Sequence, residues 1–391
     1  AFTVFTPFKT VMVSAPVLAI TELVPLLRLM MLLPNPALMV FNPPLAVMVS
    51  MPASAVTLLV PPYSTTVLSP LSVAMVLVPP LGVTTETFDL MPDRSLVKAM
   101  VEAGFQVYLV DWGKPERKDG HLGLFEYSHD MMGKALKTVR SHSGSKEISL
   151  FGWCMGGLLC LLYAGYGEDK HIRNLVTVAS PIDLRNGRNI MSYASNTLNV
   201  TARFIRKYTE FRLDRINPAL FSPPGWMVSL GFKLTAPIAS ITTYWDLLTR
   251  LSDRDFVVQH TTTSDYLNNM MLYPGGVVRD FMVRFAVDNK LAKGRMKVGD
   301  KFTELQNIRS NLLVFAGDTD HLVPASMAKQ SLKLVSSDDK TFMLAPGGHM
   351  GVILGSKAVS NVWQTSADWL RPRSQVTKTP ARRKKAAKAA A

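Results

Sequence analysis

The chain has 391 residues, 48% of them hydrophobic, a formal net charge of +14 and two cysteines. That length suits one large α/β domain with an inserted subdomain, or two modest domains. The two cysteines, Cys154 and Cys160, are too few for a disulfide framework, which excludes the disulfide-rich class and favours a reducing, cytoplasmic setting. Residues 1–16 lack the compact apolar core and the cleavage site of a secretory signal.

Residues 1–72 form a block of Val, Leu, Met, Ala and Pro with very few charges. Proline recurs at every ninth position from Pro7 to Pro79, so no proline-free window is long enough for a bilayer-spanning helix of ~20 residues. Short extended segments punctuated by proline, a solenoid-like repeat and disorder all remain open as interpretations. The near absence of charge argues against a separate domain.

From about Val73 the pattern changes to alternating strands and helices. Apolar runs rich in branched and aromatic residues predict strands, and apolar residues at helical spacing between them predict helices. Asp93 is expected to cap a helix that runs to Ala103. The predicted strands cover 76–79, 105–111, 147–151, 175–178, 311–316 and 341–344, and further helices cover 125–140, 156–166 and a closing segment that ends near Trp369. Strands separated by helices imply a mostly parallel sheet.

Between residues 184 and 290 this alternation lapses into amphipathic, aromatic-rich helical sequence. We expect a helical cap inserted between two parts of the core, 73–183 and 291–372. Because the cap interrupts the core, it is expected to act as a lid that covers the catalytic centre and excludes water from it.

The end of the chain, residues 373–391, is rich in Lys and Ala and has too little apolar surface to fold by itself. It is expected to be a disordered tail that could contact anions or nucleic acid. Six basic residues lie in its last fourteen positions: Lys378, Arg382, Arg383, Lys384, Lys385 and Lys388.

The segment from Gly152 to Gly157 carries the chemistry. Gly152-x-Cys154-x-Gly156 has the spacing of a nucleophile elbow, in which a strained turn lifts the central side chain above the end of a strand. An apolar strand directly before the motif and an apolar helix directly after it make the match specific. The fold predicted from this motif is an α/β-hydrolase-type mostly parallel sheet with an inserted helical cap.

Asp320 and His349 follow the elbow in the order acid, then histidine, that this fold uses. Both lie in loops directly after predicted strands, where such a sheet places catalytic groups. A cysteine thiol with a pKa of about 8.5 needs a base or a positive neighbour to become a thiolate. His349 would supply the base, and Asp320 would hold the imidazole tautomer or act on a bound substrate.

The oxyanion donors are expected to be backbone N–H groups. One is the N–H of Met155, and the other comes from the loop that contains Leu81 and Gly82. Each such donor typically contributes about 3 kcal/mol to the transition state.

Several other residues have a structural interpretation beside a functional one. Asp318 is an alternative acid, although Asp320 lies nearer the turn. Cys160 is interpreted as a small buried apolar residue, and His321 and His260 as surface or satisfied core histidines. Three aromatic residues are assigned to packing or to the lining of a pocket: Trp153, Trp245 and Tyr266.

These motifs resemble those of the polyhydroxyalkanoate synthases over residues 73–372. The resemblance rests on 78–81 (VPPL), 88–97 (FDLMPDRSLV), 107–113 (VYLVDWG), 152–157 (GWCMGG), 320–324 (DHLVP) and the pair Gly348-His349. It implies an enzyme that polymerises (R)-3-hydroxyacyl-CoA into polyester with release of CoA through an acyl-cysteine intermediate.

In that family pattern Cys154 is the nucleophile, His349 the base and Asp320 the activator of the incoming 3-hydroxyl. The resemblance further implies a homodimer at the polyester granule surface in the cytoplasm, with or without a second subunit, and hydroxyacyl-CoA as substrate without a cofactor or metal. Residues 1–72 do not look like the charged N-terminal region of the family.

Two other functions remain open. One is a thioesterase or polyester or ester hydrolase of the same fold, because the triad alone does not choose between water and a hydroxyl group as acceptor. The other is a non-enzymatic protein that associates with granules or nucleic acid through the basic tail.

Overall fold

The computed structural model describes residues 2–5, 9–14, 27–32, 37–41, 45–51, 54–60, 73–209, 212–234 and 247–375. Trp245 and the six basic residues between positions 378 and 388 therefore lie outside the described residues. The N-terminal strands are β1 (Phe2–Phe5), β2 (Lys9–Ser14), β3 (Leu27–Leu32), β4 (Ala37–Phe41), β5 (Leu45–Met51) and β6 (Ser54–Val60).

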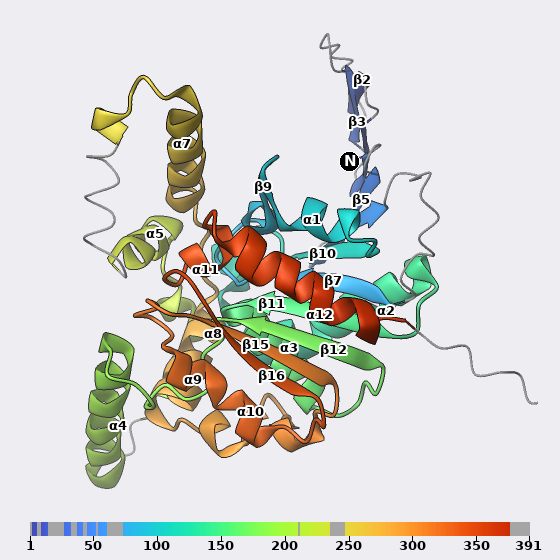
Figure 1. Ribbon diagram of the computed structural model, residues 1–391. Helices are drawn as coiled ribbons and strands as arrows, with labels where there is room; N and C mark the ends of the chain where they lie inside the picture. Colours follow the sequence, from blue (N-terminus) through green and yellow to red (C-terminus); the bar gives the residue numbers. More distant parts are fainter. Residues whose placement is uncertain are drawn as a thin grey trace, which may run out of the picture.

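Six parallel strands form the part of the sheet that positions the site (Figure 1). In spatial order they run β10-β7-β11-β12-β15-β16, and β6 pairs antiparallel with β10 on the outer side. Their bounds are β7 (Ala74–Val78), β10 (Val107–Asp111), β11 (Ile148–Trp153), β12 (Ile172–Val178), β15 (Asn311–Gly317) and β16 (Lys340–Ala345). The predicted mostly parallel sheet is confirmed.

Both faces of this sheet are covered, which explains why its strands are continuous apolar runs. In β7, Val76 and Val78 point into the core on one face, whereas Met75 and Leu77 point into the core on the other. The first face packs against α2 (Met132–Ser143), α3 (Met155–Gly165) and the π-helical η3 (Glu126–Met131), and the second against α1 (Leu96–Glu102), η9 (Val359–Gln364) and α12 (Thr365–Arg373). Burial of each large side chain contributes about 1.5–3 kcal/mol.

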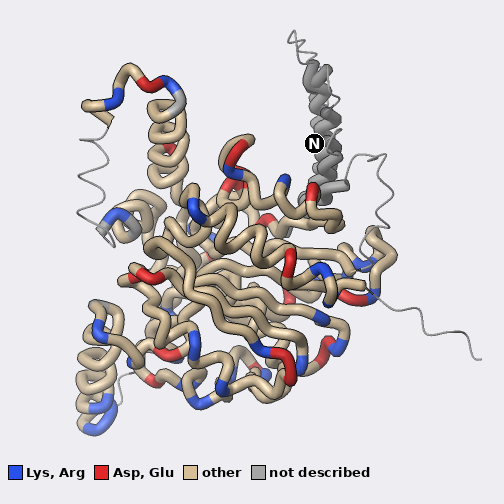
Figure 2. Tube along the Cα trace, in the orientation of Figure 1, with Lys and Arg blue, Asp and Glu red and all other residues tan. Residues whose placement is uncertain are grey.

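The order of the strands reverses beside β7. The chain goes from β7 outward to β10 and then returns to β11 on the opposite side of β7. At such a switch point the loops that leave adjacent strands diverge, and ligands bind in the crevice between them. The carboxyl ends of β7 and β11 therefore mark where a site is expected. Figure 2 shows that Lys, Arg, Asp and Glu lie mostly around this sheet and not in its centre.

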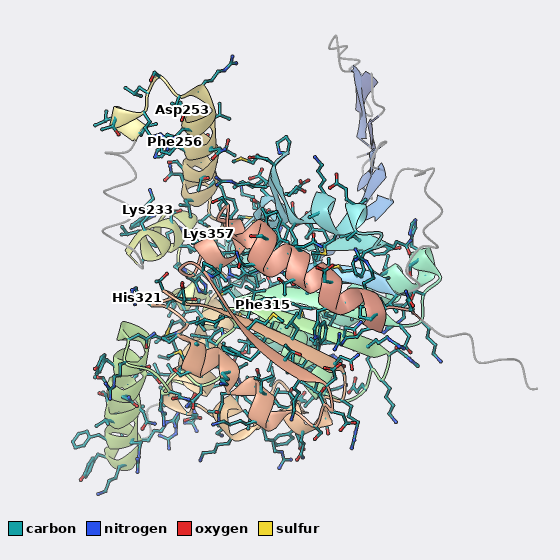
Figure 3. The ribbon with its side chains drawn as sticks, viewed as in Figure 1. Lys233, Asp253, Phe256, Phe315, His321 and Lys357 are labelled. Carbon is teal, nitrogen blue, oxygen red and sulfur yellow. The ribbon has the colours of Figure 1, made fainter. Side chains whose placement is uncertain are left out.

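The segment between β12 and β13 carries the cap helices. These are α4 (Ile190–Tyr208), α5 (Gly225–Leu234), α7 (Arg254–Asn268), α8 (Gly275–Asp280) and the π-helical η6 (Phe281–Val287). Figure 1 shows α4, α5 and α7 to one side of the sheet, and Figure 3 shows Asp253 and Phe256 at the outer end of α7, away from Phe315 in the sheet.

The structure differs from the sequence prediction at three places. Ser95, not Asp93, caps the first core helix: its hydroxyl accepts from the N–H of Lys98 at 2.9 Å. The chain around Asp93 instead forms a short antiparallel hairpin. The strands of this and of a second unpredicted hairpin are β8 (Asp89–Met91), β9 (Arg94–Ser95), β13 (Arg295–Val298) and β14 (Lys301–Glu304). At the other end α12 includes Arg373, and Ser374 is buried, so the expected tail boundary at 373 lies inside the folded part.

The remaining short helical elements connect these parts. They are η1 (Thr85–Phe88), η2 (Arg117–His121), η4 (Leu213–Arg215), η5 (Pro218–Phe221), η7 (Leu291–Lys293), η8 (Leu305–Asn307), α9 (Ala325–Lys329), α10 (Ser331–Leu334) and α11 (Gly351–Leu354). No helix within the described ranges is both long and apolar enough to cross a membrane.

Candidate active site

Cys154 stands on a sharp turn between β11 and α3. Its φ of +51° and ψ of −118° lie outside the regions that side chains with a Cβ ordinarily adopt, a conformation that costs about 1–3 kcal/mol. The turn is held because the Cys154 N–H donates to the carbonyl of Val178 at 2.8 Å. Cys154 is partly buried, and the lid hypothesis stays a prediction.

Two glycines make this turn possible by close approach. A Cβ on Gly156 would run into the carbonyl oxygen of Val78, and a Cβ on Gly152 would run into the backbone of Gly157. In each case the obstacle is backbone, which does not move aside as a flexible side chain can. The spacing seen in the sequence therefore has a steric cause.

Asp320 and His349 meet at the ends of β15 and β16. The Nδ1 of His349 lies 2.9 Å from Oδ2 of Asp320, and both residues are 5% exposed. The other carboxylate oxygen, Oδ1, accepts from the N–H groups of Leu322 and Val323 at 2.9 and 2.8 Å. Both carboxylate oxygens thus have partners within the loop and the histidine, and the imidazole ring is fixed in orientation.

The second imidazole nitrogen, Nε2, is free of the bond to Asp320, and His349 interacts with the nearby Cys154. Nε2 is buried and makes no hydrogen bond of ordinary geometry with the described residues. Burial by itself lowers the pKa of His349, but the nearby Cys154 as thiolate and the Asp320 carboxylate outweigh it and raise that pKa to about 10. The protonated form of His349 is therefore favoured. Catalytic hydrogen bonds are often long before substrate binds.

The alternative residues lie elsewhere. Asp318 is on the surface, where its carboxylate accepts from the N–H of Gly347 at 2.8 Å, and that hydrogen bond lowers its pKa. His321 is exposed on the outside of the same loop (Figure 3). His260 lies in α7, its ring 6.4 Å from that of Phe256. Cys160 is fully buried in α3, and burial raises the pKa of its thiol.

The loop after β7, residues 79–82, is called the donor loop below. It begins next to the elbow, where the indole N–H of Trp112 donates to the Pro79 carbonyl at 2.9 Å. It ends at Gly82, which has a left-handed φ of +80°. Met155 is the first residue of α3, so its N–H is among the four at a helix start that have no acceptor within the helix. The expected donors Met155, Leu81 and Gly82 thus lie at two neighbouring strand ends.

Three contacts of the site were not predicted from the sequence. Trp153, fully buried, packs against His349 with ring centroids 5.6 Å apart. Tyr266 of α7 shares a 2.5 Å hydrogen bond with Thr87 Oγ1, and the ring of Tyr273 lies on Gly82. Trp153 and Tyr266 were assigned to packing or pocket lining, but their partners were not predicted. The partners of the two tyrosines are more than 170 positions away in the chain.

We found no cluster of three or more His, Cys, Asp or Glu side chains suited to a metal ion among the residues that the structure describes. The polar groups that converge at the strand ends are instead one thiol, one imidazole, one carboxylate and backbone N–H groups. This set suits nucleophilic acyl transfer.

Comparison with known proteins agrees with this geometry. The family model described as alpha/beta hydrolase fold matches residues 89–356. The poly(3-hydroxyalkanoate) polymerase subunit PhaC of Haloferax mediterranei is 28% identical over 288 residues, which cover 73% of this chain and 56% of that protein. The subunit of the same name from Allochromatium vinosum is 28% identical over 73% of this chain and 77% of its own length. The predicted resemblance is confirmed, and the chain spans little more than half of the first relative.

Among solved structures, a soluble variant of monoglyceride lipase from Saccharomyces cerevisiae superimposes with a TM-score of 0.53. It is 16% identical, and the match covers 84% of this chain and 95% of the lipase. At that identity the likeness concerns the fold alone.

Proposed function

The chain belongs to the alpha/beta hydrolase fold family, and from this premise we propose that it is a polyhydroxyalkanoate synthase, an acyltransferase that polymerises (R)-3-hydroxyacyl-CoA. One observation carries the proposal: a half-buried cysteine on the elbow faces a buried histidine–aspartate pair. Cysteine suits a thioester substrate, because attack by its thiolate exchanges one thiolate for another. The relatives with polymerase names support the choice of substrate.

In the first step Cys154 thiolate attacks the thioester carbonyl. The N–H of Met155 and one from Leu81 or Gly82 hold the oxyanion that forms. When the tetrahedral intermediate collapses, the bond to the CoA sulfur breaks and that sulfur takes the proton of the His349 imidazolium. CoA leaves as a thiol, and the acyl group remains on Cys154 next to a neutral imidazole.

In the second step the 3-hydroxyl of another hydroxyacyl unit attacks the acyl-cysteine. His349 accepts the hydroxyl proton as the new ester bond forms, and the bond to Cys154 sulfur breaks to restore the thiolate. The geometry favours a role for Asp320 through His349, because both carboxylate oxygens already accept hydrogen bonds within the protein. Direct activation of the 3-hydroxyl by Asp320 would require one of these bonds to be given up.

The location and the assembly of the enzyme are part of the same proposal. A product that is an insoluble polyester places the enzyme at a granule surface in the cytoplasm. We include in the proposal a homodimer, with or without a second subunit, since the relatives are named as polymerase subunits.

A hydrolase is the second candidate, and one observation favours it. Cys154 keeps part of its surface exposed, so water has access to an acyl group on its sulfur. In that case water replaces the 3-hydroxyl in the second step, and the product is the free hydroxy acid.

Incubation of the purified protein with (R)-3-hydroxybutyryl-CoA separates these functions. A synthase releases CoA and forms insoluble polymer, and a hydrolase releases CoA and free 3-hydroxybutyrate. The non-enzymatic interpretation predicts neither product. CoA release without polymer, at any enzyme concentration, would contradict the synthase proposal.

A further inference from the structure

One contact between the cap and the donor loop is made by residues 269–273, between α7 and α8, which we call the strap. The N–H of Met271 donates to the carbonyl of Gly82 at 2.8 Å. The ring of Tyr273 covers the same glycine so closely that a Cβ there would lie 2.7 Å from Cδ2 and 3.1 Å from Cε2 of the ring. The end of the donor loop is therefore held by the cap.

The strap itself is anchored on the cap side. The N–H of Tyr273 donates to the carbonyl of Pro223 at 3.1 Å, directly before α5. Gly225, the first residue of α5, approaches the Met270 carbonyl so closely that no Cβ fits between them. The position of the strap is thus set by α5. Val228 of α5 also lies close to Gly82.

Two more contacts join α7 to the chain that follows the donor loop. The Tyr266 hydroxyl forms a hydrogen bond of 2.5 Å with Thr87 Oγ1, and Arg94 donates to Oε1 of Gln259 at 2.7 Å. The donor loop is consequently fixed at its start by the core residue Trp112 and at its end by the cap.

The conformation that these contacts hold is one that the loop would not keep by itself. Gly82 has a φ of +80°, and glycine has wide conformational freedom in the absence of other constraints. Oxyanion stabilisation depends on donors that are already in place before the reaction, within a few tenths of an ångström. A loop that is held loosely would lose this contribution.

We propose that Tyr273 is a positioning residue: its ring, together with the Met271 N–H, holds the donor loop so that the oxyanion is stabilised only while the strap is seated. The inference deepens the proposed function, since it assigns to the cap a part in the acylation step. Ring carbons of Tyr273, and not its hydroxyl, are the atoms nearest to Gly82, so Tyr273→Phe retains the positioning and Tyr273→Ala removes it.

Two reactions of Cys154 separate positioning from general damage. Acylation by p-nitrophenyl butyrate passes through an oxyanion, whereas alkylation by iodoacetamide does not. For Tyr273→Ala we expect acylation to slow by about 10- to 100-fold, the value of one poorly placed donor, while alkylation of Cys154 stays within about 2-fold of wild type. Tyr273→Phe is expected to keep both rates near those of wild type.

Tyr163→Ala is the matched control, because Tyr163 is also a partly buried tyrosine but lies far along α3, where its hydroxyl donates to Asp169. It should leave both rates unchanged. Equal loss of acylation and alkylation in Tyr273→Ala, no loss of acylation, or a Tyr273→Phe variant as slow as Tyr273→Ala would each overturn the proposal. Wild-type acylation by the nitrophenyl ester without turnover of hydroxybutyryl-CoA contradicts the proposed function alone, and the ratio of the two rates still tests the strap.

Discussion

The carboxyl edge of the sheet and the outer helix α4 of the cap differ in which side chains they bury. Around the elbow every large apolar side chain of β11 is fully buried, and the polar pair Asp320–His349 is enclosed with it. In α4 the fully buried residues are Ser192 and Ser195, whereas several large apolar side chains are exposed. Exposed apolar residues of α4 include Tyr193 at 65%, Val200 at 68% and Phe204 at 65%.

The forces that hold the two regions differ accordingly. Burial of apolar area holds the edge of the sheet, and hydrogen bonds to backbone carbonyls hold α4. Ser195 Oγ donates to Ala286 at 2.7 Å, and Asn189 Nδ2 donates to the carbonyls of His321 and Leu322 at 2.9 Å each. Each such bond contributes about 1 kcal/mol net. The catalytic residues thus lie on a part of the protein held by extensive apolar burial, whereas α4 is held by a few individual hydrogen bonds.

The largest expected effect is at the nucleophile. Cys154→Ala should reduce CoA release from hydroxybutyryl-CoA by at least about 10⁴-fold, because no other described side chain in the site is a nucleophile of this kind. The thermal unfolding midpoint should change little, since the thiol is only half-buried. Cys160→Ala is the control and should stay active. Turnover near the wild-type rate in Cys154→Ala would exclude the assigned nucleophile.

Asp320→Asn should lower turnover by about 10³-fold, because the imidazole loses its orientation and the charge that stabilises its protonated form. Asp318→Asn, the neighbouring change on the surface, should leave turnover nearly unchanged. Measurement of kcat for both variants tests the choice between the two acids. A larger loss in Asp318→Asn would show that the choice is wrong.

The same pair predicts a pH dependence. The pKa of His349 is raised to about 10, so protonation of His349 contributes stability that is complete below its ordinary pKa of about 6.5 and is lost as the pH rises through about 10. Asp320→Asn removes one cause of the raised pKa, so the pKa of His349 should fall. CoA release, which needs protonated His349, should then be lost at a lower pH than in the wild type. If the rate of CoA release falls at the same alkaline pH in Asp320→Asn and in the wild type, this coupling is contradicted.

Asn189→Ala tests the weaker region. It removes the cap of α4 and both bonds to the loop of Asp320, which should lower the free energy of unfolding by about 2–3 kcal/mol and increase amide exchange in α4. We expect turnover to change by less than a factor of about 3. Asn196→Ala, on the exposed side of the same helix, is the control. If the two variants behave alike, α4 is not held by these bonds.

The smallest effect is expected at the C-terminal end. Removal of residues 376–391 should leave turnover of soluble substrate unchanged. Removal from Arg373 onward should lower stability, because the Arg373 carbonyl accepts from Arg173 and Ser374 is buried. Thermal unfolding of the two truncated chains measures the difference. Equal midpoints would show that the folded part ends earlier.

The sequence predicts the core well because its signals are local. The six strands are apolar runs. Cys154 follows its strand directly, and Asp320 and His349 lie in the loops after β15 and β16. Asp93 was assigned wrongly because the three- and two-residue strands of its hairpin are too short to show a period. The contacts of Tyr273 with Gly82 depend on the path of the whole cap, which no local pattern encodes.

The strained turn at Cys154 has a consequence for the balance between stability and activity. With a φ of +51° the position suits glycine better than any residue that carries a Cβ. Replacement of the cysteine by glycine would relieve that strain, so the inactive Cys154→Gly chain should unfold at a higher temperature than Cys154→Ala. Selection for catalysis therefore retains at this position a residue that selection for stability alone would replace.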